Sequence, residues 1–247
     1  QTPEMTGAIQ KDRAGLQRML RPESDDPVLR AASALADELG ICLHIGSTAI
    51  DVGGGMAANR AVVFGSDGSV LGRYDKIHMF DVDLDHGESW RESAVYRPGE
   101  VARTVDLDGT TLGLGICYDI RFPHLFRDLA LAGAEILTAP AAFTRQTGEA
   151  HWHVLQRARA IENGAFMISA AQGGVHEDGR ETYGHSLIVD PWGRVIAEAK
   201  GSEPGVIVAT LALEEVKIAR ARIPNLKNAR SYRIESELQS AKGAQVA

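Results

Sequence analysis

The chain has 247 residues, of which 44% are hydrophobic, and this suits a globular protein with a sizeable core. Its formal net charge is −7 and no basic block offsets the acids, which argues against nucleic acid or an anionic membrane as main partner and favours a small molecule. The apolar stretches fall short of a membrane span, and two cysteines are too few for a disulfide scaffold, so we expect a cytoplasmic protein.

The first half of the chain predicts a helix followed by a strand and a hairpin. Asp26 can cap the helix, Pro27 suits its first turn and Gly40 can end it. The elements after it are a buried strand, a glycine-rich loop and a hairpin, expected at 41–50, 51–59 and 60–77. Cys42 lies within the apolar strand and is expected to be a core residue.

The second half repeats this order. It predicts a helix, a strand, a loop and a hairpin that turns at PWG, expected at 151–164, 165–172, 173–182 and 186–199. Ahead of them we expect a strand, a helix and a strand, at 110–117, 123–134 and 135–143. The two halves therefore read as copies of one unit, although helix and strand alternation alone could produce the match by coincidence.

Such a duplication predicts an α/β fold, an α-β-β-α sandwich of two mixed sheets with internal pseudo-symmetry. Aligning Pro3 with Pro140 makes QTPEM the tail of a strand, so we expect a strand and a helix to be missing ahead of Gln1. A genuine frayed terminus at Gln1 is the alternative. Residues 1–232 are expected to form one domain, with a polar C-terminal tail at 233–247.

The segment GLGICYDIRFP carries the sharpest chemical signal. Cys117 ends an apolar strand where the chain passes into a loop and helix, a usual place for a nucleophile because the turn exposes the side chain and directs backbone N–H groups at an oxyanion. The alternative is a buried core thiol.

A nucleophilic thiol needs a base, and histidine is the usual one. A Cys-His protease arrangement therefore has to be considered, although the spacing does not select among His78, His151, His153 and His185. Because His151 and His153 are two residues apart on a helix, they point in different directions, which argues against a metal pair. A cation near the thiol would lower the thiol's pKa and could stabilise an oxyanion. Lys76 is the candidate for this cation, and the alternative is an ordinary solvated lysine.

Three separated segments carry a resemblance to a known family. PEM, YDKIHMFD and GICYDIRFP resemble, in order, the three signature segments of the nitrilase superfamily of carbon-nitrogen hydrolases. The similarity continues through AFTRQTGEAHWHVLQRARAIENGAF and YGHSLIVDPWG to about IPNL, and so covers nearly the whole chain. Three motifs in order are far more specific than any one of them.

The resemblance implies a general base, an oxyanion-stabilising lysine and a nucleophile, which correspond to Glu4, Lys76 and Cys117. The family's second glutamate, which orients the lysine, corresponds to Glu92, with Glu88 as the less favoured candidate. The backbone N–H of Tyr118 would complete the oxyanion hole. The resemblance implies neither a metal nor an organic cofactor, and it implies a homodimer or higher homo-oligomer.

Within the superfamily, the chain is most similar to the deaminated glutathione amidase branch, because it carries the AAQ-x-G-x-H-x-x-x-R loop that the omega-amidase branch lacks. The implied substrate is a small anionic amide. Its carboxylates could pair with arginines, although any one arginine could instead form a surface ion pair. The expected substrate-binding residues are Arg121, Phe143, Thr144, Arg145 and Arg180. Three alternatives stay open: an omega-amidase, an N-carbamoyl amino acid hydrolase, and an inactive truncated member that only binds a partner.

Overall fold

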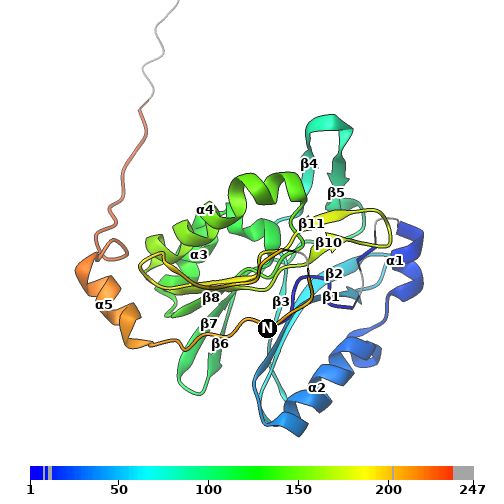
Figure 1. Cartoon of the computed structure of the whole chain (residues 1–247), viewed down its shortest axis with the longest axis horizontal. Helices are drawn as coiled ribbons and strands as arrows, with labels where there is room; N and C mark the ends of the chain where they lie inside the picture. The colour runs from blue at the N-terminus through cyan, green and yellow to red at the C-terminus, as the bar shows by residue number, and fades with distance from the viewer. Residues whose placement is uncertain (8, 11–12, 202, 236–247) are drawn as a thin grey trace, which may run out of the picture.

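The structure, a computed structural model, describes residues 1–7, 9–10, 13–201 and 203–235. Two main sheets form its centre (Figure 1). The first sheet has three antiparallel strands in the order β1 (Leu43–Asp51), β2 (Ala57–Phe64) and β3 (Val70–Asp75). The second has six strands in the order β13 (Val195–Glu198), β12 (Leu187–Val189), β9 (Phe166–Ser169), β8 (Ile136–Thr138), β7 (Thr110–Leu114) and β6 (Arg103–Leu107).

Helices cover the outer faces of the two sheets (Figure 1). The longer helices are α2 (Pro27–Leu39) on the first sheet and α3 (Pro123–Leu131) and α4 (Arg145–Asn163) on the second. The remaining α-helices are α1 (Arg13–Met19) and α5 (Glu214–Arg222), and short 3₁₀ turns lie at Glu23–Asp25, Asp85–Gly87, Glu92–Ala94 and Cys117–Arg121. Two small antiparallel pairs are β4 (Asp81–Asp83) with β5 (Ser89–Arg91) and β10 (Gly173–Val175) with β11 (Glu181–Tyr183).

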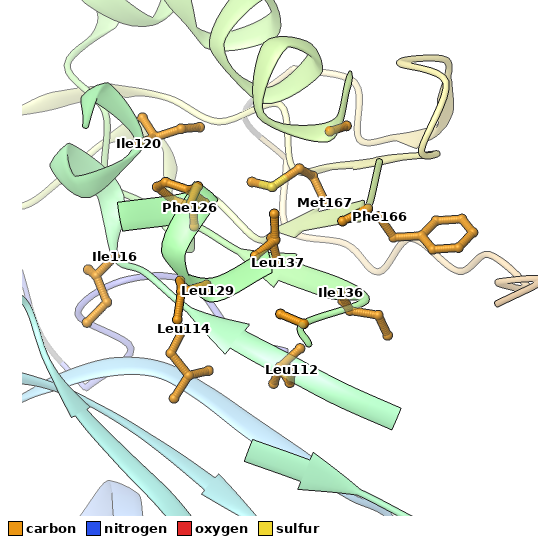
Figure 2. Close-up of a cluster of buried hydrophobic side chains, with 14 of the residues drawn as sticks. Leu112, Leu114, Ile116, Ile120, Phe126, Leu129, Ile136, Leu137, Phe166 and Met167 are labelled. Carbon is orange, nitrogen blue, oxygen red and sulfur yellow. The ribbon is translucent and has the colours of Figure 1, made fainter. Parts of the chain in front are cut away.

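Strand β2 shows why the sheets must stack. Its side chains alternate between two cores: Val62 and Phe64 pack with α2, whereas Ala61 and Val63 join the cluster that contains the second sheet. Because both faces of β2 are apolar and buried, neither can face water. Figure 2 shows part of the larger cluster, with side chains from the second sheet and the adjoining helix. The layers therefore run α-β-β-α, as expected.

Both predicted ends of α2 and the predicted C-terminal end of α4 are confirmed, whereas α4 begins at Arg145 rather than at the predicted residue 151. The Asp26 carboxylate accepts the Leu29 N–H at 2.9 Å, and Gly40 ends α2 in the left-handed conformation at φ 61°. Gly164 ends α4 in the same way at φ 52°. In each case the chain then enters a strand of one of the two main sheets, β1 after α2 and β9 after α4.

The two halves correspond in topology. Strands β1, β2 and β3 form an antiparallel meander, and β9, β12 and β13 form another. The segment before each helix also lies along the matching strand: Thr2 donates its N–H to the His44 carbonyl at 3.0 Å, and Ala139 donates to Ile168 at 3.4 Å. Because Thr2 and Ala139 immediately precede Pro3 and Pro140, the predicted alignment of the two halves is supported.

Several expectations need correction. Among the described strands, parallel strand pairs occur in the second sheet, at β7–β8 and β8–β9, whereas the first sheet has only isolated parallel bridges, such as Arg21 with Ile50, because hairpins rather than crossovers join β1 to β3. Cys42 is exposed rather than a core residue, since it precedes the first residue of β1. The predicted loop 173–182 contains most of the β10–β11 hairpin. From residue 236 onward, the predicted tail lies outside the described residues. Among the described residues, no helix combines the length and apolarity that crossing a membrane requires.

Candidate active site

Cys117 lies at the bend between β7 and the 3₁₀ turn Cys117–Arg121. Its backbone takes the left-handed conformation at φ 48°, which is costly for a residue with a side chain, and its N–H donates to the Pro140 carbonyl at 2.9 Å. This strained bend directs the thiol into a cavity that the described residues enclose. The position has the geometry of a nucleophile at a strand-to-helix turn.

The buried carboxylate of Asp119 holds this bend. It accepts hydrogen bonds from the Ile116 N–H at 2.9 Å, the Tyr74 hydroxyl at 2.7 Å and the His78 N–H at 3.0 Å, and His78 Nδ1 lies 2.7 Å from it. Because Ile116 precedes Cys117 and Tyr74 comes from the other sheet, Asp119 links the thiol's backbone to both layers. The family resemblance did not draw attention to this residue.

Lys76 lies just after β3 and is 2% exposed. Its Nζ is 3.0 Å from Glu4 Oε1 and 2.8 Å from Glu92 Oε2. A buried ammonium needs such partners, because removing its charge from water without them costs on the order of several kcal/mol. Glu92 is fixed in turn by the Phe80 N–H at 2.7 Å. Glu88 instead accepts from the Trp90 indole at 2.7 Å, so Glu92 is the glutamate beside the lysine.

Glu4 is held although it lies near the start of the chain. Its Oε2 accepts the Ala142 N–H at 2.9 Å, and its neighbour Met5, at φ 55°, donates its N–H to Ser47 Oγ at 3.0 Å. The Gln172 side chain donates to the Glu4 carbonyl at 3.1 Å. Contacts from both halves of the chain therefore position this carboxylate.

Asn59 is a site residue that the sequence did not single out. Its Nδ2 donates to Glu4 Oε1 at 2.9 Å and to Glu92 Oε1 at 3.1 Å, and the residue is buried on β2. It therefore bridges the same two carboxylate oxygens, Glu4 Oε1 and Glu92 Oε1, that the Lys76 ammonium contacts. A polar asparagine in a mostly apolar strand is the one signal that could have identified it.

The charges of the cluster support one another. Burial alone would raise the pKa of Glu4, but the Lys76 charge and hydrogen bonds from Cys117 and Asn59 lower it overall. Burial would lower the pKa of Lys76, but Glu4 and Glu92 raise it well above its usual range. Burial and the Glu4 charge both raise the pKa of the Cys117 thiol. The resting site therefore holds a thiol beside a carboxylate, with the lysine charged.

The cavity around Cys117 has a volume of about 450 Å³, enough for a small molecule. Glu4, Lys76, Glu92, Cys117 and Tyr118 all line it, as do the predicted substrate-binding residues Arg121, Phe143, Thr144 and Arg180. Aromatic walls come from Phe80, Trp90 and Tyr96, and further arginines from Arg13 and Arg91. The structure thus gathers most of the predicted site from distant parts of the sequence.

The two arginines of greatest interest differ in their partners. Arg180 lies over the Trp90 ring at 4.3 Å, and within the described part of the chain its Nε is buried without a hydrogen-bond acceptor. Arg121 lies 5.2 Å from the Phe143 ring centre, and burial lowers its pKa. Arg180 also donates from Nη2 to the Gln10 carbonyl at 3.4 Å, and Arg121 Nη1 lies 3.2 Å from His151 Nδ1. The remaining N–H groups of a guanidinium held against a ring are well suited to a carboxylate ligand.

Arg145 does not lie in the cavity. It begins α4, is exposed and pairs with Glu149 and Glu181, each at 3.1 Å. The surface ion pair that was the alternative for any one arginine therefore applies here.

The chain is similar to known proteins over most of its length. Residues 7–221 match the model of the family described as carbon-nitrogen hydrolase. A deaminated glutathione amidase of Yersinia enterocolitica is 38% identical, with 92% of this chain and 77% of that protein covered. The omega-amidase NIT2 of Mus musculus is also 38% identical, with 83% of this chain and 74% of that protein covered.

Solved structures share the fold. The NitFhit protein of C. elegans superposes with a TM-score of 0.84 at 33% identity, over 93% of this chain. This chain spans 56% of that protein. The sandwich architecture and the resemblance of the three motifs agree with these matches. The chain therefore belongs to the carbon-nitrogen hydrolase family of the nitrilase superfamily, and within it is most similar to the deaminated glutathione amidase branch.

Proposed function

We propose that this chain is a cysteine-dependent amidase that hydrolyses a small carboxylate-bearing amide, deaminated glutathione, to an acid and an amine; a primary amide at the same site would give an acid and ammonia. One observation carries the proposal. The ion-paired carboxylate of Glu4 contacts Cys117 inside a cavity that also presents arginines. The similarity to a deaminated glutathione amidase supports the choice of substrate.

In the first half of the reaction, Glu4 takes the thiol proton as the Cys117 sulfur attacks the amide carbon. The high pKa of the thiol and the low pKa of Glu4 keep the proton on sulfur until a carbonyl is in place, so transfer and attack occur together. The carbonyl oxygen becomes an oxyanion, stabilised by Lys76 and the Tyr118 N–H. Glu4 then gives the proton to the departing nitrogen, which leaves as an amine, or as ammonia from a primary amide, and a thioester remains.

In the second half, Glu4 removes a proton from water as the water oxygen attacks the thioester. The same two donors hold the second oxyanion, which collapses to the acid and expels the sulfur. The proton on Glu4 returns to that sulfur. Hydrogen bonds from Asn59 and to Glu92 hold the Lys76 ammonium and the Glu4 carboxylate in position during both halves of the reaction.

The arginines argue for an anionic substrate. The ammonium of Lys76 is already neutralised by two carboxylates. The cavity wall also carries the guanidinium of Arg180, whose ion pair with Asp178 is 3.8 Å long, and that of Arg121, for which the described residues offer no ion pair. A carboxylate accepting a bidentate hydrogen bond from either guanidinium would orient the amide group towards Cys117.

The test is the rate of amide hydrolysis of three substrates, followed as release of cysteinylglycine from deaminated glutathione and as release of ammonia from alpha-ketoglutaramate and from an N-carbamoyl amino acid. We expect kcat/KM to be at least tenfold higher for deaminated glutathione, with no release by Cys117→Ser. Preference for alpha-ketoglutaramate would make the chain an omega-amidase, which its similarity to NIT2 would explain. Faster release from the carbamoyl compound would make it a carbamoyl hydrolase. No release from any of them, with ligand binding retained, would favour an inactive binding protein.

A further inference from the structure

Two histidines and a glutamate come together outside the cavity. His153 lies on α4, His185 follows β11, and Glu198 ends β13. Glu198 Oε1 is 2.9 Å from His153 Nε2 and 2.9 Å from His185 Nδ1, and the three ligand atoms lie within 4.8 Å of one another. None of the three lines the cavity around Cys117. The proposed amidase mechanism gives them no role.

The donor set and its spacing match those of a transition-metal site. In tetrahedral zinc sites, bonds of about 2.0–2.2 Å place neighbouring ligand atoms roughly 3.3 Å apart, so these atoms need only small shifts. Imidazole nitrogen and carboxylate oxygen are ligands that zinc accepts readily, and two histidines with one carboxylate form an established zinc-binding set. We propose that His153, His185 and Glu198 bind one zinc-like divalent metal ion, with water in the fourth position.

The surroundings favour a built site over a fortuitous ion pair. The Tyr183 ring stacks on His185 at 4.3 Å and meets His153 edge-on at 6.0 Å, so aromatic contacts as well as Glu198 fix both imidazoles. The three side chains are 28–34% exposed, which leaves a path for an ion to enter from solvent. A site that is preformed and open requires little reorganisation to bind metal.

Sequence spacing does not reveal this cluster. His151 and His153 are close in sequence but point in different directions on their helix, whereas the partners of His153 are 32 and 45 residues away. A bound ion would join α4 to the strands of the second sheet. Metal binding to the folded state alone would raise the melting temperature.

The test is titration of the Cys42→Ser/Cys117→Ser double variant with Zn²⁺ and Co²⁺. The background is needed because thiolates also bind zinc and Cys42 is exposed. Calorimetry should give one Zn²⁺ per chain and a higher melting temperature. Co²⁺ should give the intense visible absorption of a four-coordinate ion.

Three further variants in the same background locate the ion. His153→Gln and Glu198→Gln should each weaken Zn²⁺ binding at least tenfold and abolish the cobalt absorption. His151→Gln, two residues away on the same helix, should bind like the background protein. His153→Gln replaces a partly exposed helical residue, so circular dichroism should report an unchanged fold. Absence of binding in the background protein, or equal binding by His153→Gln and His151→Gln, would overturn the proposal.

Discussion

At the scale of single residues, the Glu4–Lys76–Glu92 cluster explains how a carboxylate can stay ionised in a buried site. Two acids and one ammonium leave a net negative charge that Asn59 helps to hold by donating to both acids. The pKa of Glu4 is lowered only because the Lys76 charge and the hydrogen bonds together outweigh the effect of burial. In the proposed mechanism, the lysine therefore acts on the base as well as on the oxyanion.

Lys76→Met should reveal both effects. For the parent protein, we expect kcat/KM to be constant from neutral pH down to about 4.3, the value of a free glutamate, and to fall only below it, as Glu4 becomes protonated. In the variant, burial is no longer offset by the lysine charge and raises the Glu4 pKa, so kcat/KM should begin to fall nearer neutral pH. The plateau value of kcat/KM should be roughly 10²–10³-fold lower than in the parent protein, as for removal of an oxyanion donor. An unmoved acid limb in a pH–rate profile would contradict this assignment.

Asp119→Asn tests the support of the nucleophile. An amide nitrogen cannot accept the bonds that Ile116, Tyr74 and His78 donate, so the bend at Cys117 should loosen. We expect kcat to fall by tenfold or more and the rate of Cys117 alkylation by iodoacetamide to change by a similar factor. The free energy of unfolding, measured in urea, should fall by about 1–3 kcal/mol. Asp128→Asn, an exposed carboxylate on α3, is the control and should change neither.

Arg180→Met and Arg145→Met form a matched pair for substrate recognition. Arg180 lines the cavity and Arg145 lies on the surface, so only the first change should raise KM, by roughly tenfold or more for a lost charged hydrogen bond. The kcat should be affected less than KM. Equal KM values of the two variants for hydrolysis of deaminated glutathione would rule out Arg180 as a carboxylate partner.

At the scale of elements, the fit between β1 and the segment carrying Glu4 matters most. A Cβ added at Gly46 would lie 2.1 Å from the Thr2 carbonyl oxygen and 2.5 Å from that of Pro3, both of them backbone atoms. Only glycine permits this approach, because real Cβ atoms do not come so close. The strand thus sets the position of the proposed base.

Gly46→Ala should therefore cost activity out of proportion to stability. Pushing the Glu4 segment by about 1 Å should lower kcat on the order of a hundredfold, whereas overpacking costs about 1–3 kcal/mol. Steady-state kinetics and a urea melt measure the two. Gly205→Ala, where a Cβ meets open space, is the control. A loss of stability with kcat retained would show that Glu4 tolerates displacement.

The elements differed in how far the sequence could predict them. Helix α2 was predicted with both ends because a cap, a proline and a glycine mark them locally. The β10–β11 pair was expected to be a loop, since three-residue strands rich in glycine and polar residues carry no periodicity. The start of α4 at Arg145 was also missed, because nothing in the apolar pattern marks that first turn.

At the scale of the whole molecule, the repeated order of elements predicted the sandwich, and three motifs predicted where its chemistry lies. What escaped prediction depends on contacts between distant segments. Asn59 and Asp119 acquire their roles only when the two sheets stack, and Arg145 leaves the cavity only because its helix turns it outward. Local sequence carries no record of such pairings.

The most direct measurement is the mass of the protein during turnover. The Cys42→Ser variant, mixed with deaminated glutathione and quenched in acid, should gain the mass of one acyl group, and peptide mapping should place it on Cys117. The same mixture with Cys117→Ser should gain nothing. Turnover of Cys117→Ser at the parent rate, or acylation of Cys42 with Cys117 unmodified in the parent protein, would contradict the proposed mechanism.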